Sequence, residues 1–365
     1  MKNIMIVNGY LGIGGAERVL TFLANELCKK YNVYFVTLRV YENNLFSLNS
    51  KVKLIELNVE KERKSSREMG VIGTIKYFVK IIKIIKNLVN KLNINLVISF
   101  NDRETFLTWF ALHNNKNIKL LFSQRNAPSS KLKRTNMFLR YIYHHCNGVV
   151  FQLKDVEKFY GLGGEKNSII IENPNQCNLL EIKKEKKKKI VSAGRLTKQK
   201  RFDVLIDAFS IFSSKYEDYI LEIYGSGEEK NNLLAQIRLY ELNNKVKIMD
   251  PISNVMQENS DAEMFVLASD YEGIPNILIE AMSAGIPCIS TDCVPGGGDL
   301  LTNHGKCGLL VECDNPNRLA EAMILYAENE ELRKNNVIRA FEYLKKFDKK
   351  NIANKWLNFI EYIID

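Results

Sequence analysis

The sequence of 365 residues predicts two consecutive α/β domains, each built around a parallel, doubly wound sheet. The chain opens with a strand, a glycine-rich turn, a helix and a second strand, in that order. A strongly charged run interrupts the pattern halfway along the chain, and the same alternation then begins again. Hydrophobic residues make up 46% of the chain, which is enough to form two cores of ordinary size.

The first half of the chain has the pattern of one doubly wound domain. Residues 2–8 are mostly apolar and predict a strand, and residues 9–15 form a glycine-rich turn. Apolar side chains from Val19 to Leu27 share one broad helical face, and a second strand follows at 33–38. Further short apolar runs predict strands at 96–100, 119–123 and 148–152.

The charged run EIKKEKKKK, at 181–189, is interpreted as an exposed linker between the domains. After it, a strand at 190–193, an amphipathic helix at 202–212 and a strand at 220–224 repeat the opening pattern. The alternation continues with strands at 246–249, 264–267 and 287–290. The second half therefore predicts a second sheet of the same kind.

These patterns predict an N-terminal domain at 1–180, a C-terminal domain at 181–348 and a terminal helix at 349–365. The terminal helix carries apolar residues at helical spacing, so we expect it to pack on one of the domains, with the N-terminal domain as the candidate. Doubly wound sheets bind ligands beyond the carboxyl ends of their strands. We therefore expect the ligand in a cleft between the two domains.

Composition narrows the class of protein. The formal net charge of +10 favours anionic partners such as nucleotide phosphates, acidic lipids or nucleic acid. The seven cysteines form no CxxC pair and the four histidines no HExxH motif, so we expect reduced thiols, a cytoplasmic protein and no metal site. No apolar stretch is long enough to span a membrane. Basic residues are not interleaved with aromatics as in nucleic-acid-binding modules, so nucleic acid ranks last among the partners.

The first motif, Gly12-Ile13-Gly14-Gly15, joins the first predicted strand to its helix. Glycines let the backbone approach a bound group, and a helix N-terminus offers amides to phosphate. Glu17 occupies the third glycine position of the dinucleotide fingerprint, which disfavours NAD. A tight turn that merely requires glycine is the alternative.

A basic pair marks the start of the second half. Arg195 follows the strand at 190–193, and Lys200 lies in the same strand-to-helix loop. An arginine fork and a lysine ammonium at this point suit a pyrophosphate. By spacing alone, a solvated basic surface fits these residues equally well.

The third motif places two glutamates around a predicted helix start. Glu272 lies in the loop after the strand at 264–267, Gly273 and Pro275 mark the turn, and Glu280 lies in the helix beyond. Amides at a helix start suit phosphate, and a carboxylate accepts hydrogen bonds from ribose hydroxyls. Paired carboxylates also occur in glycoside hydrolases, and isolated surface glutamates are the third possibility.

The chain resembles the family 4 retaining glycosyltransferases of the GT-B fold, in which two Rossmann-like domains face each other across a donor-binding cleft. The resemblance is closest to bacterial members that extend polysaccharides or glycan precursors. It covers nearly the whole chain in order and keeps the E-x7-E signature. The segments that carry it are GGAERVL, SAGRLTKQKRFDVLIDAF, EIYGSGEEKNNL and ASDYEGIPNILIEAMSAGIPCISTDCVPGG.

The resemblance implies roles for individual residues. Arg195 and Lys200 match the pair that holds the donor diphosphate, Glu280 matches the ribose-binding carboxylate, and Glu272 matches the glutamate that faces the donor sugar. Arg195, Lys200 and Glu272 are therefore the implied catalytic residues. The implied substrate-binding residues are Gly14, Gly15, Arg125, Gly225, Ile252, Gly273, Ile274, Pro275, Asn276, Ile277 and Glu280.

Two positions depart from the family pattern. Residues 250–252 match the nucleobase contact, but Asp250 or Pro251 replaces the usual glycine. Gln124, in Ser-Gln-Arg-Asn, stands where relatives have a histidine or a glutamate, and it cannot act as a base because it has no ionisable group. Its neighbour Arg125 suits either an anionic substrate or a structural ion pair.

The segment 71–92 predicts an amphipathic helix with lysines largely opposite an apolar face. Anionic lipid attracts each lysine of such a helix by roughly 1 kcal/mol, so attachment to the inner face of the cell membrane is one interpretation. A core-packed helix with a solvated basic face is the other.

The resemblance implies a retaining transfer of a hexose or N-acetylhexosamine from a UDP-sugar to a glycan or lipid-linked acceptor. UDP is preferred over GDP or ADP by family habit alone. No cofactor or metal is required in this scheme, because Arg195 and Lys200 neutralise the diphosphate. A sugar-nucleotide epimerase or a phosphorylase of the same fold is the alternative.

Overall fold

The computed structural model describes residues 1–12, 14–40, 47–59, 66–125, 128, 133–164, 167–183 and 185–365. The chain divides into two compact units. The first is Met1–Asn173 with Lys350–Asp365, and the second is Pro174–Lys349. The boundary between the two units, at 173/174, therefore lies before the predicted domain boundary at 180/181.

The N-terminal unit contains, in its described part, a seven-stranded parallel sheet with the order β3-β2-β1-β4-β5-β6-β7. Strands β4, β5 and β6 are buried along nearly their whole length, as expected of parallel strands covered on both faces. The strands are β1 (Asn3–Asn8), β2 (Asn32–Thr37), β3 (Lys53–Glu56), β4 (Leu96–Ser99), β5 (Lys119–Gln124), β6 (Gly148–Phe151) and β7 (Ser168–Ile170). The helices are α1 (Gly15–Leu27), α2 (Ser66–Lys91), α3 (Asp102–Leu112), α4 (Lys133–His145) and α5 (Lys154–Phe159).

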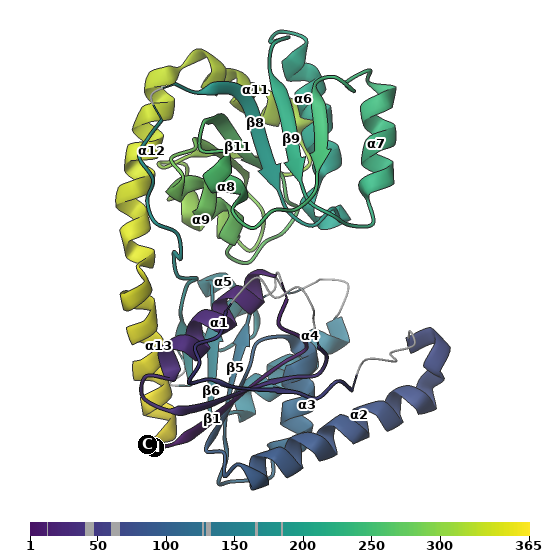
Figure 1. The fold of residues 1–365 in the computed structure, drawn as a ribbon, viewed down its shortest axis with the longest axis vertical. Helices are drawn as coiled ribbons and strands as arrows, with labels where there is room; N and C mark the ends of the chain where they lie inside the picture. The colour runs from purple at the N-terminus through teal and green to yellow at the C-terminus, as the bar shows by residue number, and fades with distance from the viewer. Residues whose placement is uncertain are drawn as a thin grey trace. The chain divides into compact units, whose positions relative to one another are not determined.

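The terminal helix α13 (Lys349–Ile364) belongs to the core of this unit (Figure 1). Its Trp356 is fully buried and stacks on Phe100, with the ring centroids 5.7 Å apart. Ile352, Ile360 and other apolar residues of α13 lie in the same core cluster as β1 and α1. Helix α13 thus shares one hydrophobic core with β1 and α1, which lie at the other end of the sequence.

The described residues of the second unit form a six-stranded parallel sheet with the order β10-β9-β8-β11-β12-β13. Helices α6 and α11 pack together, and α9 packs with α8 and α12 (Figure 1). The strands are β8 (Lys187–Ala193), β9 (Ile220–Tyr224), β10 (Val246–Met249), β11 (Ala262–Leu267), β12 (Cys288–Thr291) and β13 (Leu309–Val311). The helices are η2 (Lys198–Lys200), α6 (Phe202–Ser213), α7 (Lys230–Leu239), α8 (Val255–Glu258), α9 (Asn276–Ser283), α10 (Gly297–Thr302), α11 (Pro316–Glu328), α12 (Glu330–Leu344) and η3 (Lys345–Phe347).

Both sheets reverse their strand order once, between β1 and β4 in the first unit and between β8 and β11 in the second. In sheets of this kind, ligands bind outside the carboxyl ends of the strands at the point of reversal. In the second unit, the loops after β8 and β11 meet there, and these loops carry the two motifs expected to hold the donor.

The interpretation of 181–189 as an exposed linker is wrong for its second half, because β8 begins at Lys187. The lysines find partners within the unit. The ammonium group of Lys189 lies 3.2 Å from Asp261 and donates to Asn259, while that of Lys186 donates to the carbonyl oxygens of Ser260 and Gly285. Burial lowers the pKa of Lys186 to about 8. Charge density alone therefore did not identify an unpacked segment.

Candidate functional site

The loop after β8 is held close to the loop after β9. The amide of Gly194 donates to Tyr224 O (3.0 Å), and the amide of Leu196 donates to Ser226 O (2.9 Å). A Cβ atom at Gly225 would overlap the carbonyl oxygen of Gly194, so only glycine fits there. Gly225 thus allows the two backbones to approach each other, and its predicted contact with substrate stays a prediction.

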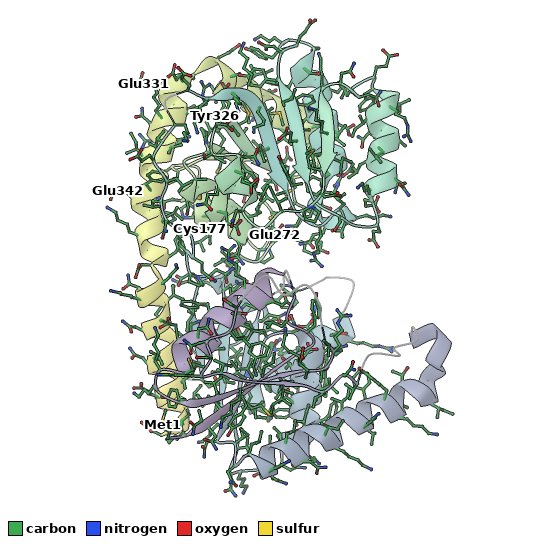
Figure 2. All side chains as sticks on the ribbon, in the orientation of Figure 1. Met1, Cys177, Glu272, Tyr326, Glu331 and Glu342 are labelled. Atoms are coloured by element: carbon green, nitrogen blue, oxygen red, sulfur yellow. The ribbon has the colours of Figure 1, made fainter. Side chains whose placement is uncertain are left out.

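Lys200 and Glu272 form an ion pair across the reversal point of the second sheet. The Nζ atom of Lys200 lies 2.5 Å from Oε1 of Glu272, and the side chains are only 13% and 9% exposed. The hydroxyl of Ser269 donates to the same oxygen at 2.7 Å. Figure 2 labels Glu272 at the carboxyl end of this sheet. Tyr326, also labelled, lies toward the other end, where its hydroxyl donates to the carbonyl oxygen of Cys288 at the start of β12. The structure thus brings together two predicted catalytic residues from separate loops.

Arg195 lies in the same loop as Lys200 but does not interact with the Lys200–Glu272 pair. Its side chain is exposed and makes no hydrogen bond or ion pair with any residue that the structure describes. A guanidinium in this position is available to an external anion. In this loop Lys200 is thus paired with a carboxylate, whereas the side chains of Arg195 and Lys198 are exposed.

The loop after β11 is packed against the loop after β12. Glu272 pairs with Gly296 in a parallel bridge, and a Cβ atom at Gly297 would overlap the carbonyl oxygen of Gly273. This contact sets the direction of the chain just before α9. Gly297 was not predicted as a site residue, and the run of three glycines at 296–298 after a strand was the available signal.

Helix α9 follows this loop directly. Pro275 is its N-cap, Asn276 and Ile277 lie in its first turn, and Ile274, just before the N-cap, is buried. Glu280 is half-buried on the same helix. The predicted phosphate-binding and ribose-binding positions therefore lie on one short element that begins beside Glu272.

The predicted nucleobase position lies at the edge of the sheet. Ile252 follows β10, the outermost strand on that side, and its side chain is exposed. Asp250 is also exposed, with its carboxylate 3.6 Å from the ammonium group of Lys230. No backbone contact distinguishes this loop as a base site, so that assignment stays a prediction.

Gly14 and Gly15 start helix α1 in the N-terminal unit, Gly14 as its N-cap. The carboxylate of Glu17, a buried residue of α1, folds back against Gly14. Ile13 of the same motif lies outside the described residues. Contact of the two glycines with the donor phosphates stays a prediction.

Gln124 is the last residue of β5 in the N-terminal unit, and Arg125 follows it. The side chain of Gln124 accepts from the Tyr143 hydroxyl and donates to the Tyr160 oxygen, both at 3.2 Å. Asn126, the last residue of the Ser-Gln-Arg-Asn motif, lies outside the described part of the chain. The two tyrosines hold the amide of Gln124 in a fixed orientation.

Arg125 is buried, and burial lowers its pKa to about 9. Its guanidinium lies over the rings of Phe100 (4.5 Å) and Trp356 (5.4 Å) and donates to Asn173 at 3.1 Å. The structure thus places Arg125 against the aromatic pair that anchors α13. Its predicted contact with substrate stays a prediction.

Within the described ranges, no three His, Cys, Asp or Glu side chains are close enough together to hold a metal ion. The same ranges contain no helix with the length and apolar character needed to cross a membrane.

The model of the family "Glycosyl transferases group 1" matches residues 181–343, which include every predicted donor-site residue of the second unit. One relative, from Campylobacter jejuni, is named N-acetylgalactosamine-N,N'-diacetylbacillosaminyl-diphospho-undecaprenol 4-alpha-N-acetylgalactosaminyltransferase. It is 27% identical over 379 residues, covering 99% of this chain and 100% of the relative.

Two solved structures have the same fold over the full length. Sucrose-phosphate synthase from Thermosynechococcus elongatus superposes with a TM-score of 0.82 at 17% identity, covering 100% of this chain and 99% of that one. The pneumococcal O-GlcNAc transferase GtfA, solved with UDP and GlcNAc, has a TM-score of 0.78 at 14% identity, with the same coverage. These likenesses confirm the predicted α/β class and GT-B fold, with two parallel sheets.

Proposed function

We propose that this chain, whose residues 181–343 match the glycosyltransferase group 1 family, is a glycosyltransferase that transfers a hexose or N-acetylhexosamine from a UDP-sugar with retention of configuration. The acceptor is a glycan or a lipid-linked glycan in polysaccharide or glycoconjugate biosynthesis. The observation that carries the proposal is the buried Lys200–Glu272 pair beside the accessible Arg195, at the reversal point of the second sheet.

The charges of this site suit a nucleoside diphosphate sugar. Arg195 and Lys200 supply two cations for the diphosphate, and the amides at the start of α9 add partial positive charge. Glu272 presents a carboxylate to the sugar hydroxyls, and Glu280 presents one to the ribose. UDP is the proposed nucleotide, and the UDP bound to GtfA supports this choice by analogy of fold.

The proposed acceptor follows from the relatives. The name of the Campylobacter enzyme specifies a diphospho-undecaprenol-linked acceptor, which is a property of that enzyme. Its similarity extends over 99% of this chain and so includes the N-terminal unit. We extend the same chemical class, a lipid-linked or free glycan, to this chain as a proposal.

In the proposed reaction, the acceptor hydroxyl oxygen bonds to the anomeric carbon on the face from which the diphosphate departs. The bond between that carbon and the phosphate oxygen breaks, and the departing β-phosphate takes the hydroxyl proton. Gln124 has no ionisable group, so this route assigns the proton to the leaving group. Arg195 and Lys200 stabilise the negative charge that develops on the diphosphate, which is the largest catalytic contribution in the scheme. The scheme requires neither a metal nor another cofactor.

Acceptor-dependent release of UDP tests this proposal. UDP-galactose, UDP-glucose and their N-acetylhexosamine counterparts would be incubated with the protein, with and without a polyprenyl-diphosphate-linked sugar. We expect one donor to release UDP only when the acceptor is present. Interconversion of the UDP-sugars without release of UDP would indicate an epimerase instead. Release that depends on inorganic phosphate would indicate a phosphorylase.

We also propose that helix α2, blue in Figure 1, attaches the protein to the inner face of the cell membrane. The side chains of Val71 and Ile72 are 76% and 72% exposed, and Ile75 and Val79 are exposed further along the same helix. Ile85 and Val89 of the predicted apolar face are buried instead, so the first half of α2 is its accessible part. Lysines follow at 76, 80, 83 and 86. An apolar surface next to lysines fits an anionic bilayer.

Sedimentation with phosphatidylglycerol-containing vesicles at low salt checks this attachment. We expect the wild-type protein to bind, and Ile72→Asp to lower the bound fraction severalfold, because a charge would replace an inserted apolar group. Leu239→Asp is the matched control, since Leu239 is 77% exposed in the second unit. Equal binding of the two variants, or no binding of the wild-type protein, would contradict the proposal.

A further inference from the structure

Arg201 is an unusual residue at the donor-side loops. It directly follows Lys200 and has the left-handed backbone conformation, with φ +47° and ψ +44°. Residues other than glycine avoid this region, and they persist there where surrounding contacts over-determine them, often at functional sites. The contacts of the Arg201 side chain therefore have to stabilise this unfavourable backbone conformation.

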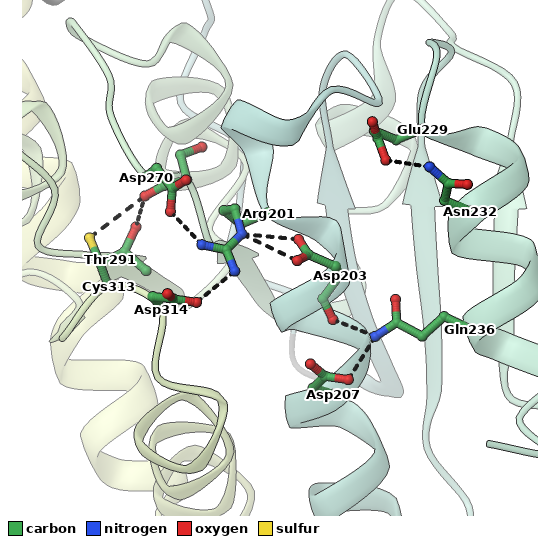
Figure 3. A network of polar contacts seen from close by, with 11 residues as sticks. Arg201, Asp203, Asp207, Glu229, Asn232, Gln236, Asp270, Thr291, Cys313 and Asp314 are labelled. Atoms are coloured by element: carbon green, nitrogen blue, oxygen red, sulfur yellow. Dashed lines mark hydrogen bonds and ion pairs between the residues drawn. The ribbon is translucent and has the colours of Figure 1, made fainter. Parts of the chain in front are cut away.

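Three carboxylates surround its guanidinium (Figure 3). The Nε atom lies 3.1 Å from Asp203 at the start of α6, Nη1 lies 2.8 Å from Asp270 after β11, and Nη2 lies 2.6 Å from Asp314 after β13. The arginine is the least exposed member of the group, at 19%. One side chain thus ties together segments that follow three strands of the second sheet.

The loop after β8 and the loop after β11 are also joined by contacts at several consecutive residues. The amide of Asp270 donates to Gln199 O at 2.9 Å, and the side-chain amide of Gln199 donates to Tyr271 O at 2.8 Å. The next links are Lys200 with Glu272 and Arg201 with Asp270. Residues 199–201 and 270–272 therefore form one continuous set of contacts. The Lys200–Glu272 pair is one member of this set, so its geometry depends on the others.

We propose that Arg201 is a positioning residue for the donor site, which holds Lys200 and Glu272 in place by tying the loop after β8 to Asp270 and Asp314. Arg201 makes no contact with the donor in this proposal. The proposal rests on the proposed function for its ligand, UDP. Its structural part, the bracing of the two loops, does not depend on any ligand.

The variant Arg201→Gly separates this role from folding. Glycine adopts a φ of +47° without a steric penalty, so the backbone is retained while the side-chain ties are lost. We expect the Kd for UDP and the donor KM to rise together by about tenfold, because a displacement of catalytic groups by about 1 Å is enough for such losses.

Arg333→Gln is the matched control. It breaks the Arg333–Glu263 pair of the same unit, in which the atoms lie 3.0 Å apart and the side chains are 14% and 8% exposed. Glu263 is near the start of β11, away from the donor loops. We expect this variant to leave the affinity for UDP unchanged while it lowers the melting temperature at least as much as Arg201→Gly does. Equal affinity for UDP in the wild type and in Arg201→Gly would overturn the proposal.

A double-mutant cycle tests whether Arg201 acts through its neighbour. In a Lys200→Ala background, we expect Arg201→Gly to cause a clearly smaller further loss of UDP affinity, since one of the two groups that it positions is already absent. A repeated tenfold loss in that background would mean that Arg201 contacts the ligand itself, contrary to the proposal.

Hydrogen exchange provides a test without ligand. The amide of Asp270 donates to Gln199, so Arg201→Gly is expected to speed its exchange by about tenfold or more, while Arg333→Gln leaves it unchanged. Unchanged exchange at Asp270 would overturn the bracing role even if the protein bound no UDP. Failure of the wild type to bind UDP, with faster exchange in Arg201→Gly, would contradict the proposed function alone.

Discussion

Lys200→Ala is expected to lower the turnover of the donor sugar by about 10²–10³-fold, the range typical for loss of a group that stabilises charge in the transition state. Lys200 has two partners in this account. It neutralises Glu272 in the structure, at 2.5 Å, and it faces the leaving diphosphate in the proposed reaction. Its loss removes a positive charge and also leaves a carboxylate that is 9% exposed without its cation. Steady-state release of UDP under saturating donor measures the effect.

Lys198→Ala is the control for this variant. Lys198 lies in the same short helix η2 but is exposed and has no side-chain partner in the described part of the chain. We expect its turnover to stay within about twofold of the wild type, as for a surface charge. A Lys200→Ala enzyme with near-normal turnover would refute the assigned role. So would equal losses in the two variants.

Glu280→Ala is expected to weaken the binding of UDP by about 10- to 100-fold, which corresponds to the loss of hydrogen bonds between a carboxylate and the ribose hydroxyls. Glu280→Gln keeps an acceptor oxygen without the charge, so its loss should be smaller. Isothermal titration calorimetry with UDP measures both variants. Glu321→Ala, an exposed glutamate on α11, is the control and should bind as the wild type does. Unchanged affinity in Glu280→Ala would remove Glu280 from the donor site.

Much of the fold was predictable because buried parallel strands are continuous apolar runs. The segments that became β1, β4, β5 and β6 were recognised in this way. Strands β3, β7 and β13 were not predicted, because they are short and none of their residues is fully buried. The charged segment that leads into β8 was misassigned in part, since Lys187 and Lys189 pair with Asp261, a residue that is far away in the sequence.

The sequence was sufficient to predict which loops form the candidate site, but not which of their side chains contact each other. The sequence placed Lys200 and Glu272 after two strands, and the parallel sheet brings such positions to one edge. Their direct pairing depends on the contacts between the two loops, and these contacts cannot be predicted from the spacing of residues in the sequence. Arg201 was missed for a related reason: in a chain with 52 lysines and arginines, one more cation beside Lys200 carries no signal until its three carboxylates are located.

The measurement that tests the central claim most directly is calorimetric titration of the wild-type protein with UDP, GDP and ADP, with and without EDTA. The account predicts that UDP binds more tightly than the other two nucleotides and that EDTA leaves this affinity unchanged, because Arg195 and Lys200 neutralise the diphosphate. Absence of nucleotide binding would contradict the assigned donor site. Binding that is lost in EDTA would contradict the metal-independent scheme.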